Sequence, residues 1–179
     1  MLTLDNPVIS AVRSDEEFLL AVKSQVDIVF MLKADIFTIS DLIKNANGKK
    51  VFVHIDMADG VGKDKKGLEL LKNYGAYGII STKNHLISLA KELNLKTVQR
   101  FFIIDSLSVS TALDSVKSVK PDFVEIMPGV IPKAVKRFVE NTKTPVIAGG
   151  LIENKNDIIN ALSAGASAVS TAKQELWNA

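Results

Sequence analysis

The sequence predicts a compact (β/α)₈ barrel of the TIM type, an α/β fold with a parallel sheet. Three observations support this prediction. Strand-sized apolar runs alternate with helical segments eight times along the 179 residues, as expected of repeated βα units. The runs are apolar on both faces, as in strands that helices cover. The last two runs end in a glycine pair and in two hydroxyl residues, which suits the phosphate site that many such barrels form after strands seven and eight.

The first four units occupy residues 7–93. Strands are expected at 7–12, 26–32, 51–55 and 77–80, where apolar residues, mostly Val, Ile and Phe, are concentrated. The first helix, 15–23, has acidic residues in its first turn, and the second, 40–48, ends on Asn47 and Gly48. The third, 68–73, ends before Gly75, and the fourth covers 84–93.

The last four units occupy residues 97–170. Strands are expected at 97–104, 122–127, 146–148 and 167–170, and Pro121 introduces the second of these. Helices are expected at 110–119, at 132–139, which begins with a proline, and at 154–164, which ends before Gly165. We see no linker, so residues 1–179 are expected to form a single barrel domain. An open doubly wound sheet is the alternative, because about 22 residues per unit is short against roughly 250 residues in a typical barrel.

Composition limits the class of protein. With 47% hydrophobic and 23% charged residues the chain is a globular protein rather than a disordered one. The absence of cysteine excludes disulfides and thiolate metal sites. Residues 1–20 contain no signal peptide and the apolar runs are strand-sized, so a cytoplasmic protein without membrane contact is expected. The net charge of +2 leaves nucleic acid open as a partner, because a local basic face can coexist with a near-neutral total.

The glycine and hydroxyl pairs predict where an anion binds. Gly149 and Gly150 let backbone N–H groups approach an anion closely. Ser170 and Thr171 add hydroxyl donors, and the N-terminus of a following helix adds more. Because consecutive parallel strands end at the same edge of the barrel, these four residues are expected to bind the phosphate of a small phosphorylated metabolite.

Polar residues at the other strand ends are the candidates for the rest of the ligand pocket. Arg100 and Glu125 lie within apolar strands, where an unpaired charge is costly, so they are expected to pair across adjacent strands. The pair either fills the barrel or forms a polar floor beneath a ligand. The further candidates for the pocket are Arg13, His54, Asp56, Ser81, Thr82 and Gly129.

His54 and Asp56 alternate along a strand, so both side chains are expected to point the same way. They are either an acid–base pair or a hydrogen-bonded pair at a strand end. No third ligand stands at a recognised spacing, so no metal site and no cofactor are predicted.

Two basic segments allow two interpretations each. Residues 60–67, Gly-Val-Gly-Lys-Asp-Lys-Lys-Gly, lack the order of a nucleotide-binding loop. They form either a loop that closes over the ligand or a solvated connector. Lys133, Lys136 and Arg137 lie at helical spacing and either contact RNA phosphates or form an ordinary solvated helix face.

The sequence shows no convincing catalytic residues. A Schiff-base aldolase needs a lysine inside the barrel mouth, and the expected fifth to seventh strands contain none. An Asp-x-Lys-x-x-Asp array for decarboxylation is also absent. A barrel that binds a phosphorylated metabolite without transforming it is therefore expected.

The strand-end segments, in this order and at these spacings, resemble the glycerol uptake operon antiterminator regulatory family. The resemblance implies small barrels that sense glycerol 3-phosphate and then act on the leader mRNA of glycerol-catabolism operons, so that transcription passes a terminator. It covers nearly the whole chain. The matching segments are HIDMADG at 54–60, GIIST at 78–82, QRFFIID at 99–105, PDFVEIMPG at 121–129 and PVIAGG at 145–150, with further matches at 7–13, 164–171 and 176–177.

By this resemblance, glycerol 3-phosphate is the effector. Apart from the resemblance, a homo-oligomer is also allowed. The resemblance implies that the glycine and hydroxyl pairs described above bind the phosphate. It also implies that the pocket near the glycerol end of the effector is lined by Arg13, Asp56, Arg100 and Glu125.

Two residues depart from the family pattern. Lys83 follows Ser81 and Thr82 where relatives often have arginine, which loses a two-pronged contact to phosphate or carboxylate. Glu153 follows the glycine pair where a basic residue is common, and an acid is unfavourable beside an anion. Two alternatives therefore stay open: an enzyme for a small sugar phosphate with Asp56 or Glu125 as its base, or a phosphate-binding barrel without RNA activity.

Overall fold

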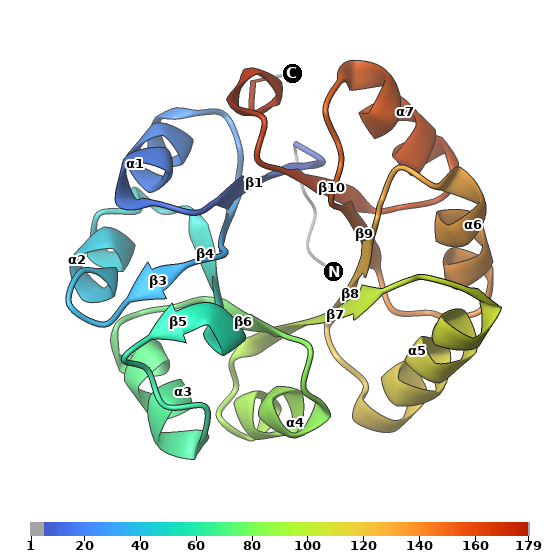
Figure 1. Ribbon diagram of the computed structural model, residues 1–179. Helices are drawn as coiled ribbons and strands as arrows, with labels where there is room; N and C mark the ends of the chain where they lie inside the picture. The colour runs from blue at the N-terminus through green and yellow to red at the C-terminus, as the bar shows by residue number, and fades with distance from the viewer. Residues whose placement is uncertain (1–5, 179) are drawn as a thin grey trace.

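The computed structural model describes residues 6–178. Within them eight parallel strands close into a barrel in the order β1-β10-β9-β8-β7-β6-β4-β2. The helices form a ring outside the strands (Figure 1). This confirms the predicted (β/α)₈ barrel and excludes an open sheet.

The barrel strands agree with the eight predicted runs to within two residues at every end. They are β1 (Val8–Val12), β2 (Ile28–Met31), β4 (Lys50–His54), β6 (Gly78–Ser81), β7 (Lys96–Phe102), β8 (Phe123–Met127), β9 (Val146–Gly149) and β10 (Ala168–Thr171). The helices are α1 (Asp15–Lys23), α2 (Ile39–Lys44), α3 (Lys65–Asn73), α4 (Asn84–Glu92), α5 (Ser106–Val119), α6 (Pro132–Glu140) and α7 (Lys155–Ser163).

The structure corrects several of the predicted boundaries. α2 ends at Lys44, four residues before the predicted Asn47-Gly48 end, and α3 begins at Lys65, three residues before its predicted start. β7 begins at Lys96, so a lysine does lie within a strand predicted to have none, although at the end opposite the barrel mouth. α5 begins four residues before the expected start. The Asp105 side chain accepts the Ser108 backbone N–H at 2.8 Å, and the Ser108 hydroxyl accepts the Asp105 N–H at 3.0 Å. This capping box fixes the helix start.

Four short elements were not predicted. β3 (Ala34–Asp35) and β5 (Ala58–Asp59) pair in parallel in a small sheet of their own, in the loops that follow β2 and β4. Two 3₁₀ turns, η1 (Ile55–Met57) and η2 (Gln174–Leu176), follow β4 and β10. Elements of two or three residues are too short to give a periodic sequence pattern.

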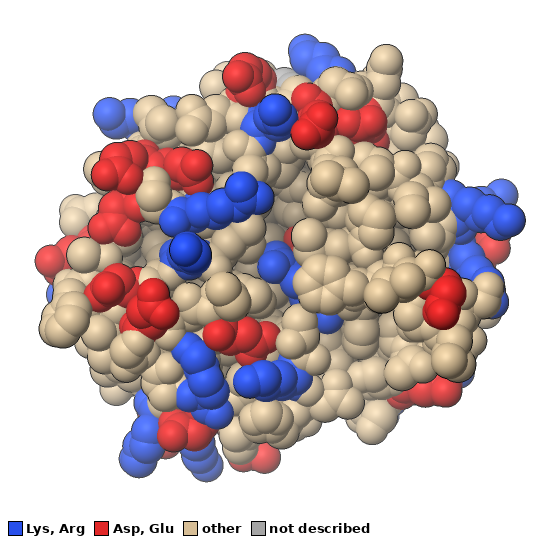
Figure 2. Space-filling view, in the orientation of Figure 1, with Lys and Arg blue, Asp and Glu red and all other residues tan. Residues whose placement is uncertain are grey.

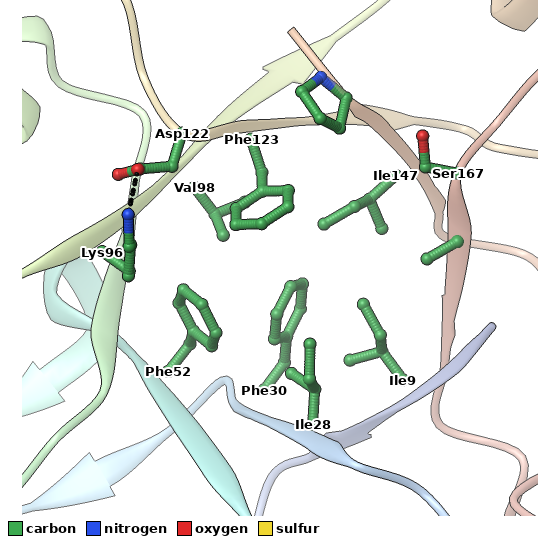
Figure 3. Close-up of a pocket in the computed structure, with 12 residues that line it drawn as sticks. Ile9, Ile28, Phe30, Phe52, Lys96, Val98, Asp122, Phe123, Ile147 and Ser167 are labelled. Atoms are coloured by element: carbon green, nitrogen blue, oxygen red, sulfur yellow. Dashed lines mark hydrogen bonds and ion pairs between the residues drawn. The ribbon is translucent and has the colours of Figure 1, made fainter. Parts of the chain in front are cut away.

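Two apolar layers hold the barrel together. Ile9, Phe30, Phe52, Val98 and Ile147 point into the barrel from alternate strand positions, as Figure 3 shows. The other face of each strand packs against the helices. Toward the carboxyl ends of the strands, polar side chains are buried instead of apolar ones, and these begin the candidate site. No helix among residues 6–178 is long and apolar enough to cross a membrane.

Candidate functional site

A cavity of about 400 Å³ lies at the carboxyl ends of the strands, beside β1, β8, β9 and β10. Figure 2 views this end of the molecule and shows a central hollow bordered by basic and acidic side chains. Six of the residues that line the cavity were predicted from the sequence, namely Arg13, Arg100, Glu125, Gly150, Ser170 and Thr171; the lining also includes Lys173, Glu17, Leu151 and Glu153.

The predicted ion pair between Arg100 and Glu125 is confirmed. The two residues stand side by side in the register of β7 and β8. Arg100 Nε lies 2.5 Å from Glu125 Oε2, and Ser170 Oγ donates to Glu125 Oε1 at 2.6 Å. Because both side chains are buried and both also line the cavity, the pair forms its polar floor rather than only filling the barrel.

Gly149 is needed for packing beneath the cavity. A Cβ at this position would overlap the Glu125 carboxylate and the Ser170 hydroxyl. Gly129, another predicted pocket residue, supports the same strand end, because its N–H donates to Gly149 O at 2.6 Å and to Gly150 O at 3.2 Å. Both glycines therefore shape the floor and wall of the cavity from behind.

The two hydroxyl residues are engaged within the protein. Ser170 holds Glu125, as described above. Thr171 Oγ1 donates to Ile152 O at 2.7 Å and accepts the Lys173 N–H at 3.0 Å. Thr171 thereby ties the loop after β9 to the loop after β10. In this structure each hydroxyl hydrogen goes to a protein oxygen, so cations and backbone N–H groups are the main groups left to meet an anion.

The loop after β9 has an unusual backbone. Gly150 and Leu151 have φ angles of +77° and +61°. The left-handed region favours glycine and is uncommon for leucine. Leu151 is also exposed beside the cavity. Such conformations cluster where a ligand binds, because surrounding contacts must hold them.

Lys173 is the functional candidate that sequence reasoning missed. It lines the cavity with Arg13 and Arg100, so three cations border this space. Its signal in the sequence was a basic residue two positions after the Ser-Thr pair. Glu153, the departure from the family pattern, also lines the cavity, and Glu17 accepts the Arg13 N–H at 2.6 Å.

A second polar cluster surrounds Asp56, outside the lining of this cavity. Asp56 accepts hydrogen bonds from Ser81 Oγ at 2.8 Å, Thr82 N at 2.8 Å and Thr82 Oγ1 at 3.1 Å. Burial raises the pKa of the Asp56 carboxyl, but these three hydrogen bonds together outweigh burial, and the pKa lies below its ordinary value. Asp56 is therefore an anion held by Ser81 and Thr82.

His54 lies next to this cluster, with Nε2 3.7 Å from Asp56 Oδ2. The sequence predicted that His54 and Asp56 point the same way because they alternate along a strand. That reason was wrong, because Asp56 lies in the η1 turn and strand alternation does not set the direction of its side chain. Burial, followed by the positive charge of Arg100, lowers the pKa of His54. The ring is therefore neutral at pH 7, and its buried Nε2 makes no hydrogen bond among residues 6–178. It can accept or donate a hydrogen bond to a ligand, according to its tautomer.

The described residues form no metal-binding cluster. Among residues 6–178, no group of three or more His, Cys, Asp or Glu side chains is arranged to hold a metal ion.

Neither of the two basic segments lines the cavity. In residues 60–67, Lys63 Nζ donates to the Ala58 carbonyl, and the Asp64 side chain accepts the Gly67 N–H at 2.9 Å. On α6, Lys136 lies 4.0 Å from Glu140, and Arg137 Nη1 donates to Ser106 Oγ at 3.3 Å.

Lys133 and Arg137 line a separate hollow of about 220 Å³ between the loops after β7 and β8. Their contact with RNA stays a prediction.

Comparisons with known proteins support the family resemblance of the sequence. Residues 8–177 match the model of the family "Glycerol-3-phosphate responsive antiterminator". The uncharacterized protein YgcP of Escherichia coli (strain K12) is 35% identical, over 98% of this chain and 94% of that protein.

Two crystal structures are similar over almost their full length. The glycerol uptake operon antiterminator regulatory protein of Listeria monocytogenes str. 4b F2365 has a TM-score of 0.93 and 30% identity, over 99% of this chain and 97% of that one. A glycerol uptake operon antiterminator-related protein of Thermotoga maritima MSB8 has a TM-score of 0.85 and 31% identity, over 96% and 98%. The chain therefore belongs to the glycerol-3-phosphate responsive antiterminator family.

Proposed function

We propose that this protein is a cytoplasmic transcription antiterminator that binds glycerol 3-phosphate and, when loaded, binds the leader mRNA of glycerol-catabolism operons. Membership of the family supports the proposal. The structural observation that carries it is the cavity of about 400 Å³ at the barrel mouth, bordered by Arg13, Arg100 and Lys173. A space of this size, lined by these three cations and by the carboxylates of Glu17, Glu125 and Glu153, suits a small ligand that carries both an anionic group and hydroxyl groups.

In the proposed complex the phosphate lies beside Gly150, Arg13 and Lys173. Residues 150–152 of the loop after β9 line the cavity there, and the cations Arg13 and Lys173 contact the phosphate beside the carboxylates of Glu17 and Glu153. The two glycerol hydroxyl groups point toward the Arg100–Glu125 pair. A polyol needs both donors and acceptors, and this end of the site supplies both.

The response to the effector follows from linkage. If the effector binds one arrangement of the loop after β9 more tightly, and RNA binds that same arrangement more tightly, each ligand raises the affinity of the other by the same factor. Thr171 and Gly129 join this loop to the loops after β10 and β8. A change at one loop is therefore transmitted to its neighbours.

We assign a binding role rather than catalysis to the site. Glu125 is the best-placed base, but one of its oxygens is paired with Arg100 and the other accepts the Ser170 hydroxyl. A general base needs a free oxygen within hydrogen-bond reach of the proton that it removes.

Titration calorimetry with glycerol 3-phosphate, followed by leader-RNA binding with and without the effector, tests the proposal. We expect binding of glycerol 3-phosphate, weaker binding of glycerol or inorganic phosphate alone, and tighter RNA binding in the presence of the effector. Lys173→Ala should weaken effector binding roughly tenfold, since a hydrogen bond to a charged group contributes about 1.5–3 kcal/mol. Lys155→Ala removes a lysine that does not line the cavity and should leave binding unchanged.

Two results would contradict the proposal. Tight effector binding without any effect on RNA affinity would indicate a metabolite-binding barrel without RNA activity. Consumption of glycerol 3-phosphate, followed by ³¹P NMR, would indicate an enzyme.

A further inference from the structure

The end of the barrel opposite the candidate site is unusually basic. In a parallel barrel the strand starts and the last turns of the helices lie at the same end. By these element bounds, ten lysines and Arg137, in the last turn of α6, lie at this end within residues 6–178, which is half of the chain's 22 Lys and Arg residues. We call the ten lysines the amino-end lysines.

Helices contribute five of the amino-end lysines. Each of α1 to α5 has a lysine in its last turn: Lys23, Lys44, Lys72, Lys91 and Lys117. A lysine at this position also stabilises the helix dipole, which explains each one singly.

Of the other five, Lys120 is the C-cap of α5 and also benefits from a helix dipole. The remaining four, Lys49, Lys50, Lys96 and Lys143, lie in the connections into strands or at the first residue of a strand, beyond the helix ends. Helix dipoles alone therefore do not explain the positive charge at this end of the barrel.

Hydrogen bonds show that several of these lysines form a continuous arc. Lys49 Nζ donates to the carbonyl groups of Ser24 and Val26 at 2.8 and 2.7 Å, at the end of α1. Lys50 Nζ lies 5.8 Å from the centre of the Tyr77 ring. The Lys96 N–H in turn donates to Tyr77 O at 3.2 Å.

The arc continues past β7 to the start of β8. Lys96 Nζ contacts Asp122 at 2.7 Å, and both residues stand at the edge of the strand starts in Figure 3. Lys91 Nζ donates to the carbonyl groups of Val119 and Lys120 at 3.0 and 2.6 Å. The basic groups therefore follow the rim of the barrel from α1 to β8.

Within residues 6–178, four of the amino-end lysines have no carboxylate partner for their ammonium groups. Lys23, Lys72, Lys120 and Lys143 are exposed, and among residues 6–178 their ammonium groups make no salt bridge within 4.0 Å. Exposed ammonium groups without carboxylate partners can each neutralise a phosphate of a polyanion and release its counterions. At the effector end, by contrast, basic and acidic side chains are interspersed (Figure 2).

We propose that the leader RNA binds the protein through the amino-end lysines, at the end of the barrel opposite the effector. This inference rests on the proposed antiterminator function and places its RNA contact. Effector and RNA then occupy opposite ends and bind at the same time, without competing for space.

Two triple variants test the placement against the alternative surface on α6. The first replaces Lys23, Lys72 and Lys120 with Gln, and the second replaces Lys133, Lys136 and Arg137 with Gln. Each removes three positive charges. RNA affinity for a leader hairpin of a glycerol-catabolism operon is measured at several salt concentrations with saturating glycerol 3-phosphate.

We expect the amino-end variant to lose about two to three units of the slope of log K against log salt, because each phosphate contact contributes about 0.7–0.9. At 0.1 M salt this corresponds to a loss of affinity of roughly 100- to 500-fold by the same relation. The α6 variant should keep the wild-type slope. Effector binding by calorimetry should be unchanged in both, which shows that both variants are folded.

Two other results would overturn the inference and are distinguishable. Wild-type RNA binding with an unchanged slope in the amino-end variant and a reduced slope in the α6 variant moves the contact to α6 but leaves the antiterminator function standing. Absence of RNA binding by the wild-type protein, with or without effector, overturns the proposed function together with this inference.

Discussion

At the scale of single residues, the buried pair of Arg100 and Glu125 defines the floor of the site. Burying either charge alone inside an apolar strand would cost free energy. The two residues are neighbours in the register of β7 and β8, so each charge is paired with the other. The third partner, Ser170, comes from β10, 45 residues further along the chain. The Glu125 carboxylate is therefore fixed from two sides, and its position in turn fixes the shape of the cavity above it.

Removing one member of this pair should destabilise the protein strongly. Glu125→Ala leaves the Arg100 guanidinium buried without its carboxylate, and we expect the free energy of unfolding to fall by about 3–5 kcal/mol. Urea denaturation measures the change. In the double variant Arg100→Met with Glu125→Leu, the loss should be smaller than in Glu125→Ala. Glu140→Ala breaks an exposed pair with Lys136 and should cost about 1 kcal/mol or less.

At the scale of elements, the end of β9 and the loop that leads to α7 carry most of the site. α7 begins with a capping box, in which the Asn154 side chain accepts the Asp157 N–H at 3.0 Å and the Asp157 carboxylate accepts the Asn154 N–H at 3.1 Å. Between strand and helix the chain passes through the left-handed residues Gly150 and Leu151. A fixed strand end and a fixed helix start thus hold a strained loop at the rim of the cavity.

Gly149→Ala should damage this element and the site together. The added methyl group meets the Glu125 carboxylate and the Ser170 hydroxyl, and such overpacking costs typically about 1–3 kcal/mol. We expect a lower midpoint of thermal unfolding and weaker binding of glycerol 3-phosphate in calorimetry. Ser163→Ala, at an exposed position near the end of α7, serves as the control. Equal behaviour of the two variants would show that Gly149 is not needed for packing.

At the scale of the whole molecule, closing the barrel separates two chemical environments. The carboxyl ends of the strands meet around a cavity with buried polar groups, while the opposite end gathers exposed lysines. His54 and Asp56 lie at this end of the barrel, and folding lowers the pKa of each. The stability of the whole molecule should depend on pH through these two groups.

His54 should make stability fall as the solution becomes mildly acidic. Burial and Arg100 lower its pKa below the ordinary value of 6.5, so between the two values the unfolded chain binds a proton that the folded chain does not. The free energy of unfolding therefore decreases as pH falls below 6.5 and levels off below the folded pKa.

Urea denaturation between pH 7.5 and pH 5 checks this prediction. His54→Asn should flatten the dependence in this window, while His85→Asn, at an exposed position on α4, should keep the wild-type dependence. An identical pH profile in wild type and His54→Asn would exclude His54 as the cause. Asp56, whose pKa lies below its ordinary value of 3.8, loses its own contribution only as pH falls below 3.8 through its folded pKa.

Several predictions from the sequence held because local patterns determine them. The strands follow from apolar runs, and helix starts such as Asn154 follow from capping chemistry. The Arg100–Glu125 pair followed from the cost of burying each charge alone. Other features had no local signal. The β3–β5 sheet is too short for one, and the position of Asp56 depends on a 3₁₀ turn that interrupts strand alternation.

The sequence by itself determined the (β/α)₈ barrel, the family and the strand ends that carry the site, because these depend on periodicity and on segments of contiguous residues. The tertiary structure decided which of those strand-end residues share one cavity. It placed Arg13, Gly150 and Lys173 around the same space and left Asp56, Ser81 and Thr82 in a neighbouring cluster. It also showed that the Ser170 and Thr171 hydroxyl groups hold the protein's own oxygens. Such partnerships join residues on different strands, and only barrel closure sets the distances between them.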